Sequence, residues 1–365
     1  MGLSKERASM LWLSMAKISA RRVHSLVKKY GSFSKVFDLY FEDKYNAKET
    51  QSERKLRELH SLSTIEEKWV EIKQRGIKIL FFDDGEYPFL LKNIDDPPYL
   101  LYYAGELECL KEPMVAIVGT RNPTAYGSNI AHKIACDLAQ QGICVVSGLA
   151  YGIDAAAHRG ALEALGKTIG VLGSGITVPY PAEHRTLYRQ IAKSKGLIIS
   201  EYPIDSQPKP YHFPHRNRII SGLSLATVFV EGKIKSGGML TVGKALEQGR
   251  EVFAVPGHVG ETASEGTHAI LREGARIATS ATDILEDLGI DFDDKVNSNK
   301  VMNNLSDIQT SIVNVLKQES LFVSQIACLV KQTEETVMSE LSILEIEGLI
   351  YRGQDNRFSV AIGIV

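Results

Sequence analysis

The chain has 365 residues, of which 44% are hydrophobic and 24% are charged, and its formal net charge is −2. This length predicts about two or three domains with at least one large core. The small net charge excludes a uniformly basic protein of the kind that coats duplex DNA, and no stretch approaches the roughly 18 apolar residues of a membrane span.

Residues 1–75 are expected to form a small helical domain of the helix-hairpin-helix or SAM-like type. They hold sixteen Lys and Arg against ten Asp and Glu. Four of the basic residues, Arg21, Arg22, Lys28 and Lys29, either contact a nucleic-acid backbone or form a solvated helix face, and the sequence leaves both interpretations open. The expected helices span 5–13, 19–30, 32–41 and 42–75.

The central part, residues 76–288, alternates short apolar runs with helical patterns. It begins with a predicted strand at 77–82, an apolar run at 87–91 and a turn-rich segment at 95–98. Such regular alternation predicts an α/β domain with a doubly wound, mostly parallel, extended Rossmann-like sheet whose strands are buried on both faces. The predicted strands span 115–118, 143–146, 168–172, 197–200, 226–230, 251–255 and 275–278. The predicted helices span 128–141, 155–165, 183–192, 217–222, 241–248 and 269–273.

The last part of the chain is expected to be a separate small domain. Residues 289–304 are polar and aperiodic, which predicts a linker. Residues 305–365 resemble a winged helix, and they hold four Lys and Arg against eight Asp and Glu. This acidic balance favours a protein-contact or regulatory module over a phosphate-binding one. The expected elements are helices at 308–316, 323–329 and 337–346 and strands at 349–351 and 358–360.

Four of the predicted central strands end in a loop of small residues that a helical pattern follows. In a parallel sheet these turns lie along one edge, where glycines let the backbone approach a ligand and helix N-termini carry partial positive charge. The arrangement therefore predicts an anion-binding edge. The loops are Gly119-Thr120-Arg121, the segment 147–152 that begins with Ser147 and Gly148, Gly173-Ser174-Gly175, and Lys235-Ser236-Gly237-Gly238.

The loop sequences favour phosphate over a dinucleotide or ATP. No Gly-x-Gly-x-x-Gly occurs, and Arg121 occupies a loop position where a dinucleotide site keeps small residues. The guanidinium fork of Arg121 suits phosphate, and an ion pair with a surface carboxylate is the alternative. Gly238 to Lys244 resembles a P-loop, but Ala245 stands where a Ser or Thr would hold magnesium, so residues 236–238 are interpreted as a phosphate-binding nest.

The acidic residues near these loops do not complete a catalytic or metal site. Asp154 is predicted to be the N-cap of a helix. Glu201 and Glu231, each just after a strand, form either a carboxylate cluster for a metal or partners for nearby arginines. The sequence has no Gly-x-Ser-x-Gly elbow and no His-Glu-x-x-His spacing. No catalytic residue, metal or cofactor is therefore predicted.

The segment 208–218 interleaves aromatic and basic residues and contains three prolines. At the same edge of the sheet, this composition suits a single strand of nucleic acid, because bases stack on aromatic rings at roughly 1–3 kcal/mol each and arginines bind phosphates. For Phe213, a position in the core is the alternative. The candidate contact residues are Lys209, Tyr211, Phe213, Arg216, Asn217 and Arg218.

Together these motifs resemble the bacterial DprA family, also called Smf. The helical N-terminal domain and the winged-helix tail are also similar to those of family members that carry all three parts. The resemblance covers the whole central domain. It rests on Gly119-Thr120-Arg121, 147–154, Tyr180-Pro181, 213–221 and 235–238, and Tyr87-Pro88 and Asp96-Pro97-Pro98 extend it toward the N-terminus.

The resemblance implies a non-enzymatic protein without a cofactor. Such a protein binds and protects single-stranded DNA and loads the RecA recombinase onto it, notably on DNA taken up in natural transformation. The resemblance also implies a homodimer formed through the extended Rossmann domain. It implies that Arg121 grips a phosphate, Phe213 stacks near a base and Lys235 meets the backbone. Family members can have a lysine where this chain has Pro210, so the contact of the adjacent Lys209 stays open.

Two other functions remain as alternatives on the same sheet, a phosphoribohydrolase-like enzyme acting on nucleoside monophosphates and a nucleotide sensor. Enzymes of this kind have a glycine loop similar to Pro-Gly-Gly-x-Gly-Thr, followed by an acidic residue. Residues 236–243 of this chain contain no acidic residue. The four cysteines lack Cys-x-x-Cys spacing, and the N-terminus lacks an apolar signal core. These features predict a reducing, cytoplasmic location.

Overall fold

A computed structural model describes residues 3–41, 51–291, 305–317, 319–346, 349–353 and 356–360. The chain divides into two compact units, Met1–Ile290 and Asp291–Val365. The part of the predicted helical region at 42–50 and most of the predicted linker at 289–304 lie outside the described residues.

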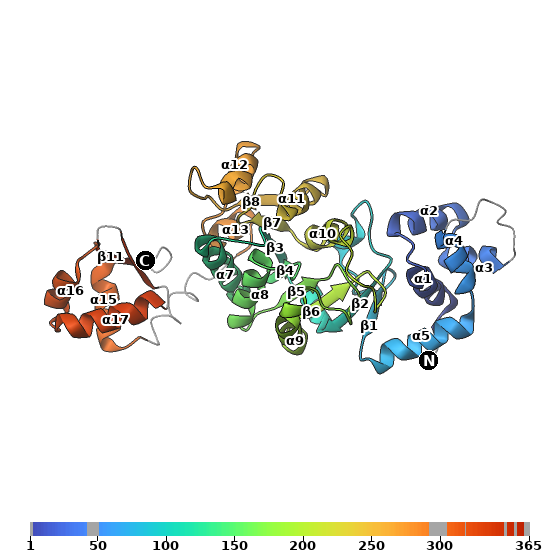
Figure 1. Cartoon of the computed structure of the whole chain (residues 1–365), viewed down its shortest axis with the longest axis horizontal. Helices are drawn as coiled ribbons and strands as arrows, with labels where there is room; N and C mark the ends of the chain where they lie inside the picture. The colour runs from blue at the N-terminus through green and yellow to red at the C-terminus, as the bar shows by residue number, and fades with distance from the viewer. Residues whose placement is uncertain are drawn as a thin grey trace. The chain divides into compact units, whose positions relative to one another are not determined.

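The first unit contains a helical N-terminal part and a sheet flanked by helices (Figure 1). Its α-helices are α1 (Lys5–Met15), α2 (Ala20–Tyr30), α3 (Phe33–Phe41), α4 (Gln51–Glu58), α5 (Leu62–Gln74), α6 (Phe89–Lys92), α7 (Ala125–Gln140), α8 (Ile153–Glu163), α9 (Arg185–Lys193), α10 (His212–Leu223), α11 (Gly237–Glu247), α12 (Glu265–Arg272) and α13 (Ala281–Asp287). Its strands are β1 (Lys78–Phe81), β2 (Leu100–Gly105), β3 (Met114–Val118), β4 (Cys144–Ser147), β5 (Thr168–Val171), β6 (Leu197–Ser200), β7 (Ala226–Phe229), β8 (Glu251–Ala254) and β9 (Arg276–Ile277). Short 3-10 helices lie at η1 (Leu107–Lys111), η2 (Ala182–His184) and η3 (Thr262–Ser264).

In the described part of the chain, nine strands form one sheet in the order β1-β2-β6-β5-β4-β3-β7-β8-β9. Neighbouring strands from β6 to β9 in this order are parallel. The strands β1 and β2 extend the sheet in antiparallel fashion, with β2 against β6. This confirms the predicted mostly parallel α/β sheet. The strand β2 was not predicted, and the apolar run at 87–91 contributes to the short helix α6.

The order of the strands places helices on both faces of the sheet. The chain moves outward from β3 through β4 and β5 to β6, then returns to β7 and continues in the other direction to β8 and β9. Because such crossovers are right-handed, α7, α8 and α9 cover one face, and α10, α11 and α12 cover the other. The direction reverses between β3 and β7, and open α/β sheets bind ligands at the carboxyl ends of the strands at such a point.

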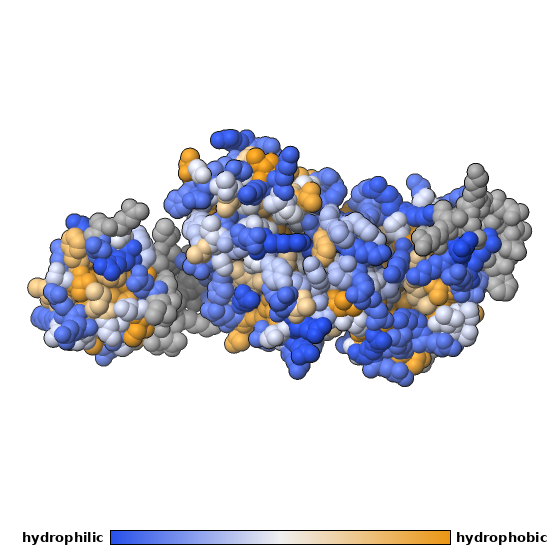
Figure 2. Space-filling model, viewed as in Figure 1, coloured by the Kyte–Doolittle hydropathy of each residue, from blue (hydrophilic) through white to orange (hydrophobic). Residues whose placement is uncertain are grey.

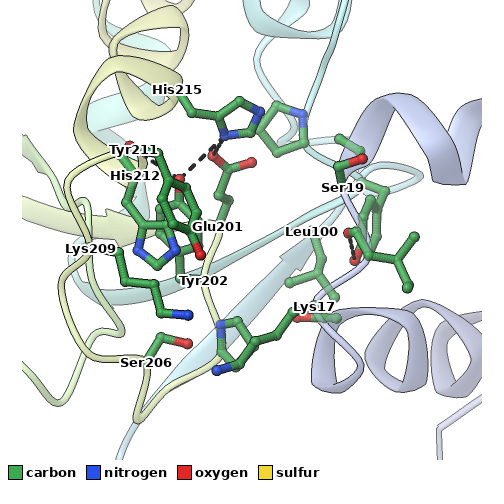
Figure 3. A pocket seen from close by; sticks show the side chains of 16 residues that line it. Lys17, Ser19, Leu100, Glu201, Tyr202, Ser206, Lys209, Tyr211, His212 and His215 are labelled. Atoms are coloured by element: carbon green, nitrogen blue, oxygen red, sulfur yellow. Dashed lines mark hydrogen bonds and ion pairs between the residues drawn. The ribbon is translucent and has the colours of Figure 1, made fainter. Parts of the chain in front are cut away.

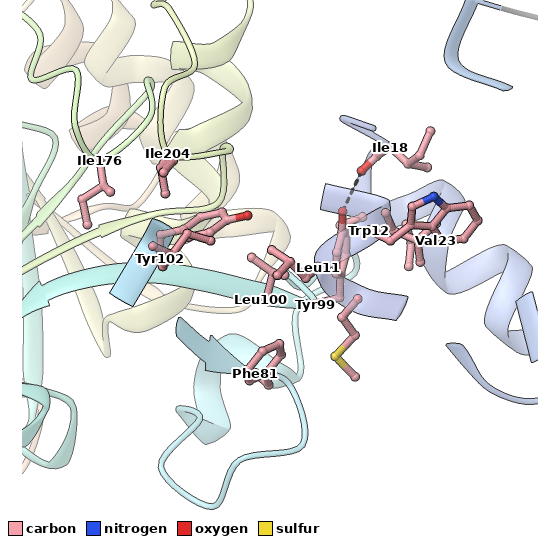
Figure 4. Close-up of a cluster of buried hydrophobic side chains, with 14 of the residues drawn as sticks. Leu11, Trp12, Ile18, Val23, Phe81, Tyr99, Leu100, Tyr102, Ile176 and Ile204 are labelled. Carbon is pink, nitrogen blue, oxygen red and sulfur yellow. Dashed lines mark hydrogen bonds between the residues drawn. The ribbon is translucent and has the colours of Figure 1, made fainter. Parts of the chain in front are cut away.

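The N-terminal helices share a hydrophobic core with the sheet (Figure 4). Trp12 of α1 and Tyr102 of β2 are both buried in this cluster. Polar contacts add to the packing, since the hydroxyls of Ser14 and Tyr102 lie 2.9 Å apart and the guanidinium of Arg7 lies 2.6 Å from the carboxylate of Asp84. The helical part is therefore held against the antiparallel end of the sheet.

The second unit consists, in its described residues, of three helices and a two-stranded antiparallel sheet. The helices surround one apolar core, to which Phe358 contributes. The observed elements agree in kind with the predicted ones, while their assignment to the winged-helix class stays a prediction. The elements are α15 (Asp307–Leu316), α16 (Val323–Val330), α17 (Glu334–Ile346), β10 (Ile350–Arg352) and β11 (Phe358–Val360).

None of the helices that the structure describes combines the length and the apolar composition needed to cross a membrane. Figure 2 shows hydrophilic residues over much of the face in view, with apolar residues in separate patches. Exposed apolar side chains belong to different elements, such as Phe89 of α6 and Leu246 of α11. Single exposed apolar residues are ordinary on protein surfaces and mark no interface by themselves.

Candidate nucleic-acid interface

The loops that follow β3 and β7 lie against each other where the strand order reverses. The backbone N–H of Thr120 donates to the carbonyl of Glu231 (2.7 Å). A Cβ on Gly238 would lie 3.0 Å from the Cα of Gly119, so a larger residue would push the start of α11 away from the loop after β3. Two of the four predicted glycine loops therefore meet at one place.

Phe213, near the start of α10, connects a third glycine loop to this place. Its ring packs against Gly173, where an added Cβ would lie 2.7 Å from a ring carbon. The guanidinium carbon of Arg121 lies 5.6 Å from the centre of the same ring, within cation–π range. The ring of Tyr180 lies 5.3 Å from that of Phe213 at a tilt of 41°. Tyr180 was not among the predicted contact residues, and the structure adds it.

Most of the segment 208–218 is helical, whereas the sequence predicted a helix only from residue 217. The helix α10 begins at His212, whose N–H donates to the carbonyl of Lys209 (2.9 Å). Pro214 is the third residue of the helix, where a backbone N–H has no partner within the helix, so the proline does not interrupt it. Every residue of α10 from Arg216 onward is buried. The ring of Phe213, in the first turn of the helix, is half-buried.

Arg216 does not reach the surface, contrary to the expectation that it binds a phosphate. It is 4% exposed, and its guanidinium donates to the carbonyls of Gly148 (2.8 Å) and Val171. Burial lowers the pKa of Arg216 to about 10, against the opposing effect of the nearby Asp154. The carboxylate of Asp154 in turn accepts from the N–H of Gly148 (3.1 Å). These groups fix the loop after β4 from beneath.

Arg218 is also buried, and it binds carboxylates in place of the expected phosphate. Its side chain is 6% exposed and lies 2.6 Å from Glu201 and 3.2 Å from Asp96. Burial alone would raise the pKa of Glu201, but the charge of Arg218 lowers it to about 2. Hydrogen bonds from His215 to Asp96 and Glu201 raise the pKa of His215 to about 9. Of the two alternatives predicted for Glu201, the arginine partner is the one observed.

Seven further predicted residues are buried and shape the loops from within, namely Ser147, Gly148, Gly173, Ser174, Gly175, Asn217 and Gly238. The hydroxyls of Ser147 and Ser174 donate to backbone carbonyls at 2.7 and 2.6 Å. The N–H of Gly175 donates to another carbonyl (2.8 Å), and the amide of Asn217 donates to the carbonyl of Gly237 (3.3 Å). Their predicted direct contact with a ligand is therefore replaced by a structural role.

The predicted residues that remain accessible form a group that we call the rim. Their side chains or backbones are exposed or half-buried, and Ser236 caps α11 by accepting from the N–H of Met239 (3.4 Å). Two cations, an aromatic ring and a helix N-terminus make the rim suited to a phosphate chain with accessible bases. Lys209 and Tyr211 are also exposed, but they line a separate cavity beside the N-terminal helices. The rim consists of Gly119, Thr120, Arg121, Phe213, Lys235, Ser236 and Gly237.

The acidic residues near the rim support loops. Glu231 accepts from the N–H (2.8 Å) and the hydroxyl (2.7 Å) of Thr124, the N-cap of α7. Asp154 lies within the first turn of α8, whose N-cap is Gly152, so its predicted role as the N-cap is wrong. Within the described ranges, no three His, Cys, Asp or Glu side chains are grouped to hold a metal ion.

Comparison with known sequences shows which family has this arrangement. The profile of DNA recombination-mediator protein A matches residues 78–289, which contain all of the sheet and the rim. The chain belongs to this family. It is 43% identical to the DNA processing protein DprA of Bacillus subtilis over 217 residues, which are 59% of this chain and 73% of that protein. It is 41% identical to protein Smf of Escherichia coli over 220 residues, which are 60% of this chain and 58% of that protein. The predicted family resemblance is confirmed.

Solved structures of related proteins have the same fold. DNA processing protein A (DprA) from Streptococcus pneumoniae is 32% identical and superimposes with a TM-score of 0.68 over 80% of this chain and 100% of that chain. DNA processing protein A from Helicobacter pylori is 30% identical, with a TM-score of 0.54 over 60% of this chain and 97% of that chain. The latter structure concerns the single-stranded DNA binding mode of that protein.

Proposed function

We propose that the chain binds single-stranded DNA along the rim and catalyses no reaction on it. The observation that carries this proposal is the contact between Arg121 and Phe213, close to the loop that starts α11. Arg121 supplies a cation, and Phe213 supplies a ring on which a base can stack. The nearby N-terminus of α11 attracts a phosphate. A single strand offers both phosphates and accessible bases to such a surface, whereas a duplex keeps its bases stacked inside.

The proposal includes the finer functions that the family resemblance implies. These are protection of the strand from nucleases, delivery of the strand to the RecA recombinase in natural transformation, action as a homodimer and a cytoplasmic location. Support comes from the relatives named DNA processing protein DprA and from the Helicobacter pylori relative, whose structure concerns single-stranded DNA binding. For residues 305–365 we propose a winged helix that contacts a protein partner, because acidic residues outnumber basic ones there.

A salt titration of binding to oligo-dT and to a duplex of equal length tests the proposal. The logarithm of the affinity for oligo-dT should fall linearly with the logarithm of the salt concentration, and the duplex should bind more weakly. Arg121→Ala and Phe213→Ala should each weaken oligo-dT binding, whereas Lys195→Gln, at an exposed lysine outside the rim, should not. Equal affinity for the duplex, or no loss in either rim variant, would contradict the proposal.

A second assay separates binding from catalysis on nucleotides. Residues 236–243 lack the acid that follows the glycine loop of phosphoribohydrolases, which favours binding. Nucleoside monophosphates incubated with the protein should therefore stay intact. Release of free base that scales with protein concentration would instead support the phosphoribohydrolase-like alternative.

A further inference from the structure

A cavity of about 340 Å³ lies between the N-terminal helices and the loop that leads from β6 to α10 (Figure 3). Residues 17–20, which run from the end of α1 to the first residue of α2, form part of one wall, and residues from the segment 201–215 form the other. Both walls belong to the same compact unit, and the volume is in the range of small-ligand sites. No rim residue is among the described residues that line it.

Two lysines extend into the cavity from opposite walls. Figure 3 shows Lys17, which follows α1, and Lys209, which precedes α10, directed into the same space. Burial has the largest effect on the pKa of Lys55 and lowers it, and the positive charges of Lys17 and Lys209 lower it further. The three ammonium groups therefore lie within electrostatic reach of one another. The lining carboxylate of Glu201 is bound by Arg218 and does not neutralise the lysines. The cavity therefore favours an anion.

Ser206 contributes a hydroxyl that the protein leaves unsatisfied. The residue is 4% exposed and lines the cavity, but its Oγ has no hydrogen-bond partner within the described part of the chain. Figure 3 places this hydroxyl below the side chain of Lys209. An unsatisfied buried hydroxyl is costly, and here it can donate to an oxygen of an anion held by the lysines.

The same wall also carries aromatic rings. The rings of Tyr202 and His212 are stacked, with centres 4.0 Å apart and 19° between their planes, and the ring of Tyr211 lies edge-on to His212 at 4.8 Å. Burial lowers the pKa of His212, and the charges of the two lysines add to this effect, whereas the hydrogen bond to the carbonyl of Gly173 and the charge of Glu201 oppose it. The cavity therefore combines a cationic, hydrogen-bonding part with an apolar aromatic part.

We propose that this cavity binds one nucleotide, with its phosphate held by Lys17, Lys209 and Ser206 and its base against the Tyr202–His212 pair. A phosphate next to an aromatic base matches the two cations, the unsatisfied hydroxyl and the stacked rings. The nucleotide is either a free mononucleotide or the 5′-phosphorylated end of a DNA strand, which present the same chemistry. The cavity and the rim are lined by different residues, so each proposal can fail without the other.

Calorimetric titration of the full chain with thymidine 5′-monophosphate tests this site, with thymidine as the matched ligand that lacks the phosphate. Lys17→Gln and Lys209→Gln should each weaken monophosphate binding on the order of ten-fold and leave thymidine binding unchanged, because they remove only a charge. Ser206→Ala should weaken the binding of thymidine 5′-monophosphate by about two- to ten-fold. Lys195→Gln, at an exposed lysine outside both the cavity and the rim, is the control and should leave monophosphate binding unchanged.

Oligo-dT with a 5′-phosphate or a 5′-hydroxyl distinguishes the two sources of the nucleotide. A preference for the phosphorylated strand that Lys17→Gln abolishes identifies a strand end, whereas equal binding of both strands with monophosphate binding retained identifies a free nucleotide. The proposal is overturned if the monophosphate shows no saturable binding and neither strand is preferred, or if both lysine variants bind like the wild type. Oligo-dT binding that still depends on Arg121 would in that case leave the function of the rim standing.

Discussion

The rim and a largely buried cluster of charged residues both contain arginines, but the two groups use them differently. In this buried cluster, the arginines are nearly inaccessible and bind carboxylates and backbone carbonyls of the protein. On the rim, Arg121 and Lys235 are exposed. Basic residues in the sequence of a sheet edge therefore predict a positive charge there. The burial of each side chain then decides whether its charge meets a ligand or holds the loops in place. The buried cluster consists of the buried residues Asp154, Arg216 and Arg218 together with the half-buried residues Asp96, Glu201 and His215.

Removing a buried charge should have the largest effect and sharpen the distinction between the two groups. Arg218→Met leaves the carboxylates of Glu201 and Asp96 with His215 as their remaining partner, so the free energy of unfolding should fall by about 3–5 kcal/mol. Arg121→Met should change it by less than about 1 kcal/mol, because Arg121 is exposed and its ring contact is a surface cation–π interaction. Urea unfolding curves measure both values. Equal losses in the two variants would remove the distinction.

Removing the aromatic ring of the rim should affect binding more than stability. Phe213→Ala should weaken oligo-dT binding by about 1–3 kcal/mol, because a stacked base loses its ring. Fluorescence anisotropy with labelled oligo-dT measures the change. Phe89→Ala, at a side chain of α6 that is 78% exposed and outside the rim, is the matched control and should bind like the wild type. Equal losses in both variants would show that the rim has no special role.

Lys235 should contribute through charge alone, with a smaller effect than Phe213. Lys235→Gln should weaken oligo-dT binding at low salt and reduce the slope of log affinity against log salt by about 0.7, the value for one contact to a single-stranded phosphate. The slope is measured by the same anisotropy assay over a series of salt concentrations. Lys195→Gln should keep the wild-type slope. An unchanged slope in Lys235→Gln would remove this residue from the rim.

The buried cluster should also show a small pH dependence that the rim lacks. Hydrogen bonds to Asp96 and Glu201 raise the pKa of His215 to about 9, above the value of about 6.5 in an unfolded chain. The charged imidazole therefore stabilises the fold fully below about pH 6.5, and this stabilisation is lost as the pH rises through about 9. Thermal melts between about pH 7 and pH 9.5 should show a decline that is shallower in His215→Gln. A decline of equal size in the variant would assign the pH dependence to another group.

Local sequence patterns were sufficient to predict the parallel sheet and the position of the rim. All five residues of Met114–Val118 are buried, and a strand covered on both faces appears in the sequence as such an apolar run followed by a glycine turn. Because parallel strands all end at one edge, the glycine turns had to share that edge. The strand Leu100–Gly105 was missed because its antiparallel pairing with β6 joins segments far apart in the chain, which a local pattern does not report.

The burial of Arg216 and Arg218 could not be predicted because their partners come from distant loops. Gly148 and Glu201 approach α10 only after the sheet has formed. One local signal was available, since a proline in the first turn is compatible with a helix that starts at His212. A helix from that residue places Arg216 and Arg218 within its length, next to the apolar residues that face the core.

The proposed function depends most on a single strand of DNA lying across the rim. Photo-crosslinking of the full chain to oligo-dT that contains 5-iodouracil tests this directly. We expect crosslinks in the peptides that contain Phe213 and Tyr180, and a strong reduction of both in Arg121→Ala. Crosslinks confined to α2 or to residues 305–360, unaffected by Arg121→Ala, would contradict it.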